Sequence, residues 1–240
     1  MSRGSASTVL VPVDVSAAEI PPTGVLDLLG GVNVLLLGYY PVPSQAAPAQ
    51  IKAQHGSEAA ERLEAVRDAI ARRVDTVAEE LCYTHDREET VDRIADEYGC
   101  TAVLRLGPAD SVDRILVPFR GDSNVDNILE LVGDLLGAGN TSVTLFHSVE
   151  EGTDQEYGET LLADAADRLS AAGIGPTRID RRLSVTDETG VDIVTAAEEF
   201  DVIVLGETDP SLRDRILGAV QRETLSETNL PVFVVRNTNA

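Results

Sequence analysis

Two cysteines and three histidines carry the side chains that could hold a metal ion or act as nucleophile or base. Cys82 and His85 stand three positions apart, and Cys100 follows near the end of a predicted helix. No fourth ligand lies nearby in the sequence, so ordinary buried thiols are favoured over a zinc site. His147 falls on a predicted strand, where a hydrogen-bonded histidine is favoured over a general base. His55 has no partner in any motif.

Sequence motifs for nucleotide-dependent or hydrolytic catalysis are missing. The single lysine, Lys52, is followed by Ala53 and is not preceded by a glycine run, which excludes a Walker phosphate loop. The sequence also lacks a Gly-x-Ser-x-Gly nucleophile elbow, a His-x-x-His pair and a Ser-Gly-Gly loop. We therefore expect a protein that is not an enzyme and that acts by binding.

The chain is strongly acidic. Its 41 Asp and Glu residues outnumber 19 Lys and Arg residues, which gives a net charge of −22 at pH 7. Nucleic acid and anionic membranes are therefore excluded as partners, because binding to either depends on cations that neutralise phosphate. All the cations except Lys52 are arginines. This combination favours a protein from a salt-rich cytosol, since molar salt screens the repulsion between like charges.

Segments that would direct the chain to a membrane are not recognisable. A strand-like run begins at Thr8, which leaves no room for the core of a signal peptide. The uncharged stretch 28–51 contains three prolines and is not a membrane span. We expect a cytoplasmic protein without direct membrane insertion, folded around the 43% of its residues that are hydrophobic.

Two copies of one unit follow each other along the chain. The run Val-Leu-Val-Pro-Val at 9–13 returns as Ile-Leu-Val-Pro-Phe at 115–119. A predicted helix and strand over 91–104 have a similar echo over 191–205. Internal similarity of this kind predicts a tandem arrangement. We expect a first unit over residues 1–110 and a second over 111–240.

Strands and helices alternate in both copies, which predicts parallel sheets covered on both faces. One helix is predicted from Ser57, because an apolar stripe at helical spacing runs from Leu63 to Leu81 behind a favourable N-cap. Arginines off that stripe, including Arg62, are predicted on a solvated face. Copy one has no counterpart of the last helix and strand of copy two, so it is truncated. The other predicted elements are strands over 8–13, 33–40, 102–104, 114–119, 142–149, 178–183, 202–205 and 231–235, and helices over 17–29, 91–98, 123–136, 155–172, 188–200 and 212–225.

The opening and closing segments of the unit resemble the universal stress protein family. The opening is Val-Pro-Val-Asp-Val-Ser over 11–16, and the closing runs from the strand 202–205 through Gly218 to the strand 231–235. The resemblance covers about 8–107 and 113–236. It implies an α/β fold of two tandem doubly wound parallel-sheet units, adenine nucleotide alpha hydrolase-like, packed as a pseudo-dimer. It also implies a homo-oligomer that pairs through the C-terminal strand.

A phosphate-binding loop is implied by the same resemblance. In nucleotide-binding members the loop reads Gly, two residues, Gly, nine residues, Gly, then Ser or Thr, and its backbone N–H groups approach the phosphates at a helix N-terminus. Gly206 and Gly218 fit this pattern. Asp209 replaces the second glycine, only eight residues separate it from Gly218, and Ala219 replaces the hydroxyl. The alternative for the two glycines is a strand-end turn and close helix packing.

The aspartate that would contact adenine is present in only one of the two copies. The family's aspartate after the first strand is kept as Asp14 in copy one, whereas copy two has Arg120 there. The resemblance implies that Val117 and Arg120 join the loop in a pocket of copy two. The alternatives are a helix N-cap or a solvated strand end for Asp14 and an exposed side chain for Arg120. Neither copy holds a complete site.

Two functions therefore remain open, and no cofactor is certain. One is a small-molecule-responsive stress regulator that binds ATP or another adenine nucleotide, or another anion, weakly. The other is an interaction module whose pocket is vestigial and which docks on a protein partner. The resemblance implies a transporter as one such partner. The damaged loop favours the second function.

Overall fold

The computed structural model of the chain describes residues 6–17, 20–75, 77–119, 121–122, 124–137, 139–150, 155–186, 189–207 and 230–237. The strands are β1 (Thr8–Asp14), β2 (Asn33–Pro41), β3 (Val77–Thr84), β4 (Ala102–Arg105), β5 (Arg114–Phe119), β6 (Ser142–Val149), β7 (Ile179–Val185), β8 (Val202–Gly206) and β9 (Val232–Val235). The helices are α1 (Thr23–Leu28), α2 (Pro48–Ala71), α3 (Arg87–Glu97), α4 (Val125–Leu136), α5 (Gln155–Ala171) and α6 (Thr189–Ala197), with 3-10 turns η1 (Leu29–Gly31) and η2 (Pro176–Arg178).

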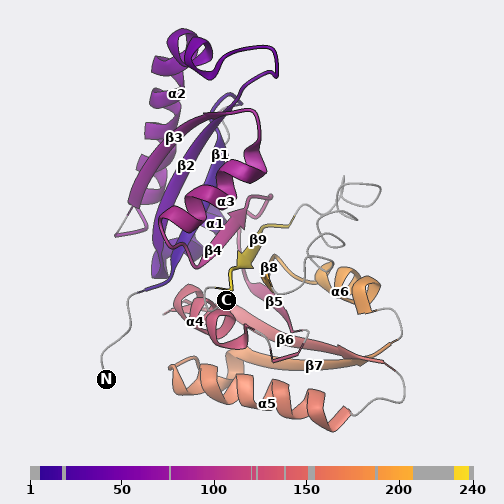
Figure 1. The fold of residues 1–240 in the computed structure, drawn as a ribbon. Coiled ribbons are helices and arrows are strands. Elements are labelled where there is room, and N and C mark those ends of the chain that lie inside the picture. The colour runs from indigo at the N-terminus through magenta and orange to yellow at the C-terminus, as the bar shows by residue number, and fades with distance from the viewer. Residues whose placement is uncertain are drawn as a thin grey trace.

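One continuous sheet contains all the described strands, in the order β3-β2-β1-β4-β9-β8-β5-β6-β7 (Figure 1). Strands β1 to β4 come from copy one and the rest from copy two. Within each copy the strands are parallel. The expected α/β fold with doubly wound units is confirmed, and the two units share one sheet.

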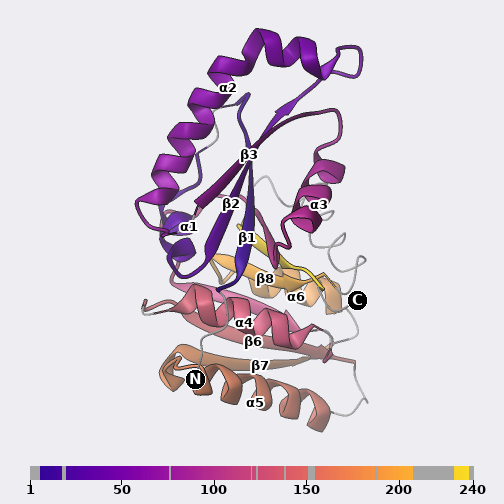
Figure 2. The same ribbon diagram turned by 60° about the vertical axis from the view of Figure 1, so that its left-hand side comes forward.

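Most of the inner strands, namely β1, β2, β5, β8 and β9, are buried on both faces, which explains why they read as unbroken apolar runs. On β1, Val9, Val11 and Val13 face one core, and Leu10 faces another. The first core is continuous through both copies and lies under α1, α2, α4 and α5 (Figure 2). The opposite face carries two separate smaller cores, one under α3 and one under α6.

The helix predicted from Ser57 to Leu81 has wrong boundaries. Helix α2 begins at Pro48, a residue suited to a first helical position, and ends at Ala71. Val77 and Leu81 lie on β3. The mistake has a geometric cause, because residues four apart share a face on a strand as they do on a helix.

The two copies meet through an antiparallel pair of strands. β4 pairs with β9 from Ala102↔Val235 to Arg105↔Val232, and the N–H of Arg236 extends the ladder to the carbonyl of Thr101 at 2.8 Å. β9 is also paired with β8 along its other edge. The expected homo-oligomer contact through the C-terminal strand is therefore wrong, because both hydrogen-bonding edges of β9 are occupied within the chain.

A second junction joins Ser7 and η1 of copy one to α4 of copy two. The main-chain N–H of Ser7 donates to Asp134 Oδ2 at 2.8 Å. A Cβ on Gly31 would stand 1.9 Å from the carbonyl oxygen of Asp134, so only glycine permits this approach. None of the described helices combines the length and the apolar character that crossing a bilayer requires.

Candidate functional site

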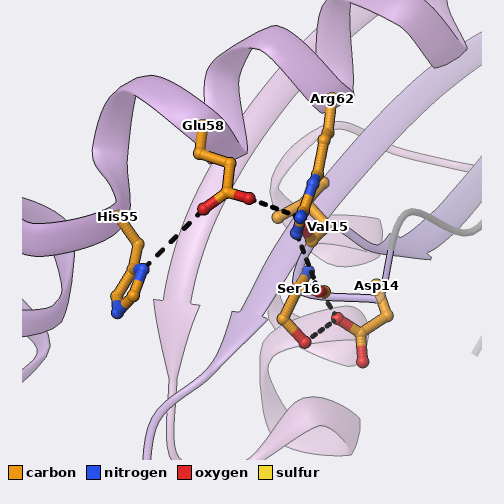
Figure 3. A network of polar contacts seen from close by, with 6 residues as sticks. All are labelled: Asp14, Val15, Ser16, His55, Glu58 and Arg62. Atoms are coloured by element: carbon orange, nitrogen blue, oxygen red, sulfur yellow. Dashed lines mark hydrogen bonds and ion pairs between the residues drawn. The ribbon is translucent and has the colours of Figure 1, made fainter.

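Asp14 lies at the carboxyl end of β1, where the turn that follows holds its carboxylate (Figure 3). Oδ1 accepts hydrogen bonds from the N–H of Ser16 at 2.8 Å and from Ser16 Oγ at 2.6 Å. Bonds from an aspartate to the residue two positions on stabilise a turn. In copy one Asp14 is thus half-buried and stabilises the turn after β1.

Arg62 ties the same loop to α2. Its Nη1 donates to the carbonyl oxygens of Val15 at 2.8 Å and Ser16 at 2.7 Å, and its Nη2 donates to Glu58 (Figure 3). The prediction that Arg62 only covers a solvated face is wrong. Its partners are main-chain carbonyls of a distant loop, which no local sequence pattern reveals. The end of β1 in copy one is thus closed by contacts within the chain.

Three aromatic rings stack between α2 and the ends of β2 and β3. Tyr40 lies 5.3 Å from His55 and 5.7 Å from Tyr83, measured between ring centroids. His55 Nδ1 is 4.0 Å from Glu58, so the stack adjoins the Arg62 contacts. Tyr83 Oη is buried without a hydrogen-bond partner in the described part of the chain. Its burial, with a smaller contribution from Tyr40, raises the pKa of Tyr83.

The predicted pocket of copy two is described only in part. Val117 is fully buried in the main core, so its side chain is unavailable to a ligand. Gly206 ends β8, in register with Val235 of β9. The other four predicted pocket residues lie outside the described residues: Arg120, Asp209, Gly218 and Ala219.

Asp14 of copy one and Gly206 of copy two each belong to an incomplete part of the family's nucleotide site. These two half-sites lie at opposite ends of the sheet. Asp14 and Gly206 each end a strand, β1 and β8 respectively. β1 is parallel to β4, β4 is antiparallel to β9, and β9 is parallel to β8. The carboxyl ends of the copy-one strands therefore lie at one end of the sheet and those of copy two at the other. The aspartate of one copy cannot complete the loop of the other.

The strand registers show that His147 of copy two corresponds to Gly38 of copy one. It is buried, and its Nδ1 lies 2.9 Å from the carbonyl oxygen of Phe119, the strand contact expected from the sequence. The residue that the helix places against this position differs in size in the opposite direction. Leu63 packs against Gly38 in copy one, whereas Gly158 lies against His147 in copy two. His147 thus fills core space that a helix side chain fills in copy one.

The two cysteines are free thiols. Cys82 is partly exposed on β3 and Cys100 is buried in the core under α3. Burial raises the pKa of Cys100 to about 11, which makes it a poor nucleophile at neutral pH. Among the described residues, no three His, Cys, Asp or Glu side chains gather as a metal site would require.

A groove runs along the centre of the sheet beside α3. The space in and above it, including the part open to solvent, is about 440 Å³. Pro12, Val103 and Val234 form an apolar floor from three neighbouring strands. The walls carry charged side chains and one valine, drawn from α3, β4 and the ends of β8 and β9: Arg87, Glu88, Val91, Asp92, Arg105, Glu207 and Arg236.

Comparison with known proteins settles the family. The model of the universal stress protein family matches residues 111–236. The chain belongs to this family. Two relatives are universal stress protein G of Shigella flexneri and universal stress protein G of Escherichia coli O157:H7. Each is 32% identical to this chain over 120 residues, which cover 46% of this chain and 79% of the relative.

The fold also resembles solved structures over nearly the whole length of the chain. A universal stress protein from Archaeoglobus fulgidus DSM 4304 matches with a TM-score of 0.64 and 15% identity, over 97% of both chains. A protein of this family from Pseudomonas aeruginosa UCBPP-PA14 matches with a TM-score of 0.55 and 12% identity, over 97% of this chain and 94% of that one. At such identities these matches bear on the fold alone.

Proposed function

We propose that this universal stress protein is a non-catalytic regulator that acts by binding a protein partner, with at most weak binding of an adenine nucleotide or another anion in copy two. The placement of the half-sites carries this proposal. Asp14 is bonded to its own turn, Arg62 closes the loop beside it, and Gly206 lies at the other end of the sheet. A nucleotide at either end would meet only part of the family's site.

The main alternative is a sensor that binds ATP or another adenine nucleotide. It rests on Gly206, Gly218 and Arg120, of which only Gly206 is among the described residues. A second alternative is a regulatory module of a membrane transporter. It differs from the main proposal only in naming the partner.

Thermal unfolding with and without nucleotides tests the proposal. The protein is unfolded in about 2 M KCl, alone and with millimolar ATP-Mg, ADP or AMP. A ligand that binds only the native state must raise the midpoint, by about 2.7 kcal/mol of stability at a hundredfold excess over its Kd. We expect no shift, which would direct the search to protein partners.

A matched pair of variants makes the test specific. Arg120→Gln removes the cation of the predicted pocket, and Arg181→Gln removes an exposed cation from β7. A shift in the parent protein that Arg120→Gln abolishes and Arg181→Gln preserves would contradict the proposal and support the nucleotide sensor.

A further inference from the structure

The groove beside α3 borders β4, the strand after which copy one has no further described helix. After β4 the chain reaches β5 within a short linker, so no helix of copy one follows β4 in the described structure. The floor of the groove is apolar, formed by Pro12, Val103 and Val234. Such a combination of apolar floor and polar walls is typical of sites for small molecules.

Glu88 occupies one end of the groove like a bound carboxylate. Its Oε2 accepts a hydrogen bond from Arg105 Nη2 at 3.1 Å, and its Oε1 lies 3.8 Å from Arg87 Nη1. The side chain of Glu88 is 61% exposed, so it can swing away without disturbing the core. Two guanidinium groups on either side of one carboxylate form a geometry that recognises carboxylates in general.

Arg87 has donors to spare. Its guanidinium lies over the ring of Tyr39 at 5.2 Å and makes no hydrogen bond within the described ranges. Arg236 stands at the far end of the groove, where its Nη2 bonds Asp96 at 2.7 Å. The Nε of Arg236 is buried without a hydrogen-bond partner among the same residues.

The charge of the lining is balanced, unlike that of the molecule. Three arginines oppose Glu88, Asp92 and Glu207, whereas the whole chain carries −22. If Glu88 moves aside and a monocarboxylate takes its place, the charge between the arginines is unchanged. An organic acid therefore fits here although the rest of the surface repels anions, and molar salt limits that repulsion to about 3 Å.

We propose that the groove binds a small organic acid, whose carboxylate replaces that of Glu88 between Arg87 and Arg105 and whose apolar body lies on Pro12, Val103 and Val234. Glu88 then acts as an internal competitor for the site. Among the described residues the groove shares Glu207 with the predicted loop of copy two, but Glu207 lies beside Arg236, at the other end of the groove from Arg87 and Arg105. The test of carboxylate binding is therefore distinguishable from that of the proposed function.

Titration followed by NMR tests the proposal. Butyrate and inorganic phosphate are added separately to the ¹⁵N-labelled protein at constant ionic strength near 2 M, and the amide signals of Val91, Val103 and Val234 are followed. We expect butyrate to bind and Glu88→Gln to tighten its binding by about three- to fivefold, because an exposed ion pair competes only weakly. Arg105→Gln should weaken butyrate binding at least about tenfold, because hydrogen bonds to charged groups are strong.

The control variants make the same change of charge on the same helix, α3, but at positions outside the groove. Glu89→Gln removes the same charge one position along α3 and should leave binding unchanged, as should Arg93→Gln, whose side chain pairs with Glu97. Arg87→Gln is a second test, since the loss of a guanidinium without hydrogen bonds spares the fold. Equal affinity of Glu88→Gln and the parent protein, no butyrate binding by any variant, or binding of phosphate without butyrate would overturn the proposal.

Discussion

Arg62 shows how one side chain sets the shape of a loop. It bonds the carbonyl oxygens of Val15 and Ser16, and hydrogen bonds from a charged donor contribute more than neutral ones. We expect Arg62→Gln to lower the free energy of unfolding by about 1–2 kcal/mol. Arg67→Gln is the control, because the ion pairs of Arg67 with described residues are all to exposed carboxylates on and near α2. Chemical denaturation at high salt measures both, and equal effects would contradict the role of Arg62.

Cys100 gives the stability of the protein a pH dependence. Burial raises its pKa from 9.0 to about 11, with a smaller opposing effect of Arg236. An unfolded chain loses the thiol proton first, so the stabilising contribution is present below pH 9 and is lost as the pH rises towards 11. At about 1.4 kcal/mol per unit, the loss is roughly 2–3 kcal/mol. The free energy of unfolding is compared with that of Cys100→Ala between pH 8 and 11, and parallel curves would refute the prediction.

Two glycines, one on α4 and one on η1, should respond to substitution by alanine with opposite changes in stability. An added Cβ on Gly133 of α4 would meet no heavy atom within 4 Å, whereas one on Gly31 would collide with the main chain of Asp134. Gly133→Ala should therefore stabilise the protein by about 0.5–1 kcal/mol through helix propensity. Gly31→Ala should destabilise it by about 1–3 kcal/mol through overpacking. Thermal unfolding of both variants checks the signs, and a stabilised Gly31→Ala would contradict the close junction between the copies.

The elements also show what the sequence could predict. Strands β1, β5 and β8 are apolar runs buried on both faces, and their patterns located them correctly. β3 is an edge strand interrupted by Glu79 and Glu80, so its sequence pattern predicts the end of a helix instead of a strand. The antiparallel contact of β4 with β9 is decided by packing between the copies, which neither strand's sequence encodes.

The candidate sites differ in the same way. Asp14 and Ser16 are two positions apart, so their turn could be expected from the sequence. The closure by Arg62 and the pairing of Glu88 with Arg105 join segments far apart in the chain. Residues from such different elements come together only when the chain folds, so no spacing in the sequence predicts these contacts.

At the scale of the whole molecule, β9 connects the two copies. Removal of the chain after residue 229 would expose the edges of β4 and β8 together. We expect this truncation to cause cooperative loss of structure and aggregation, because β9 contributes four buried apolar residues to the middle of the sheet. Because both edges of β9 are paired within the chain, the 240-residue chain should have the mass of one copy, 25.6 kDa, in light scattering after size-exclusion chromatography. A folded truncated monomer would contradict the central role of β9.

The net charge of −22 predicts that stability depends on salt. Repulsion between carboxylates opposes the compact state, and salt screens it. We expect the unfolding midpoint to rise steadily as KCl increases from about 0.2 M to 3 M, measured by circular dichroism. A midpoint independent of KCl would contradict the interpretation of the acidic surface as an adaptation to salt.

The pairing of β4 with β9 has a consequence for synthesis of the chain on the ribosome. The partner of Val103 is Val234, which is made roughly 130 residues later, or on the order of 10 s at ordinary rates of translation. Until then the N-terminal half carries an open, apolar edge strand, which is prone to wrong pairing. Completion of the sheet must wait until β9 has been made, so copy one should reach its final structure only after copy two is synthesised, and slowly, as expected when contacts are distant in sequence.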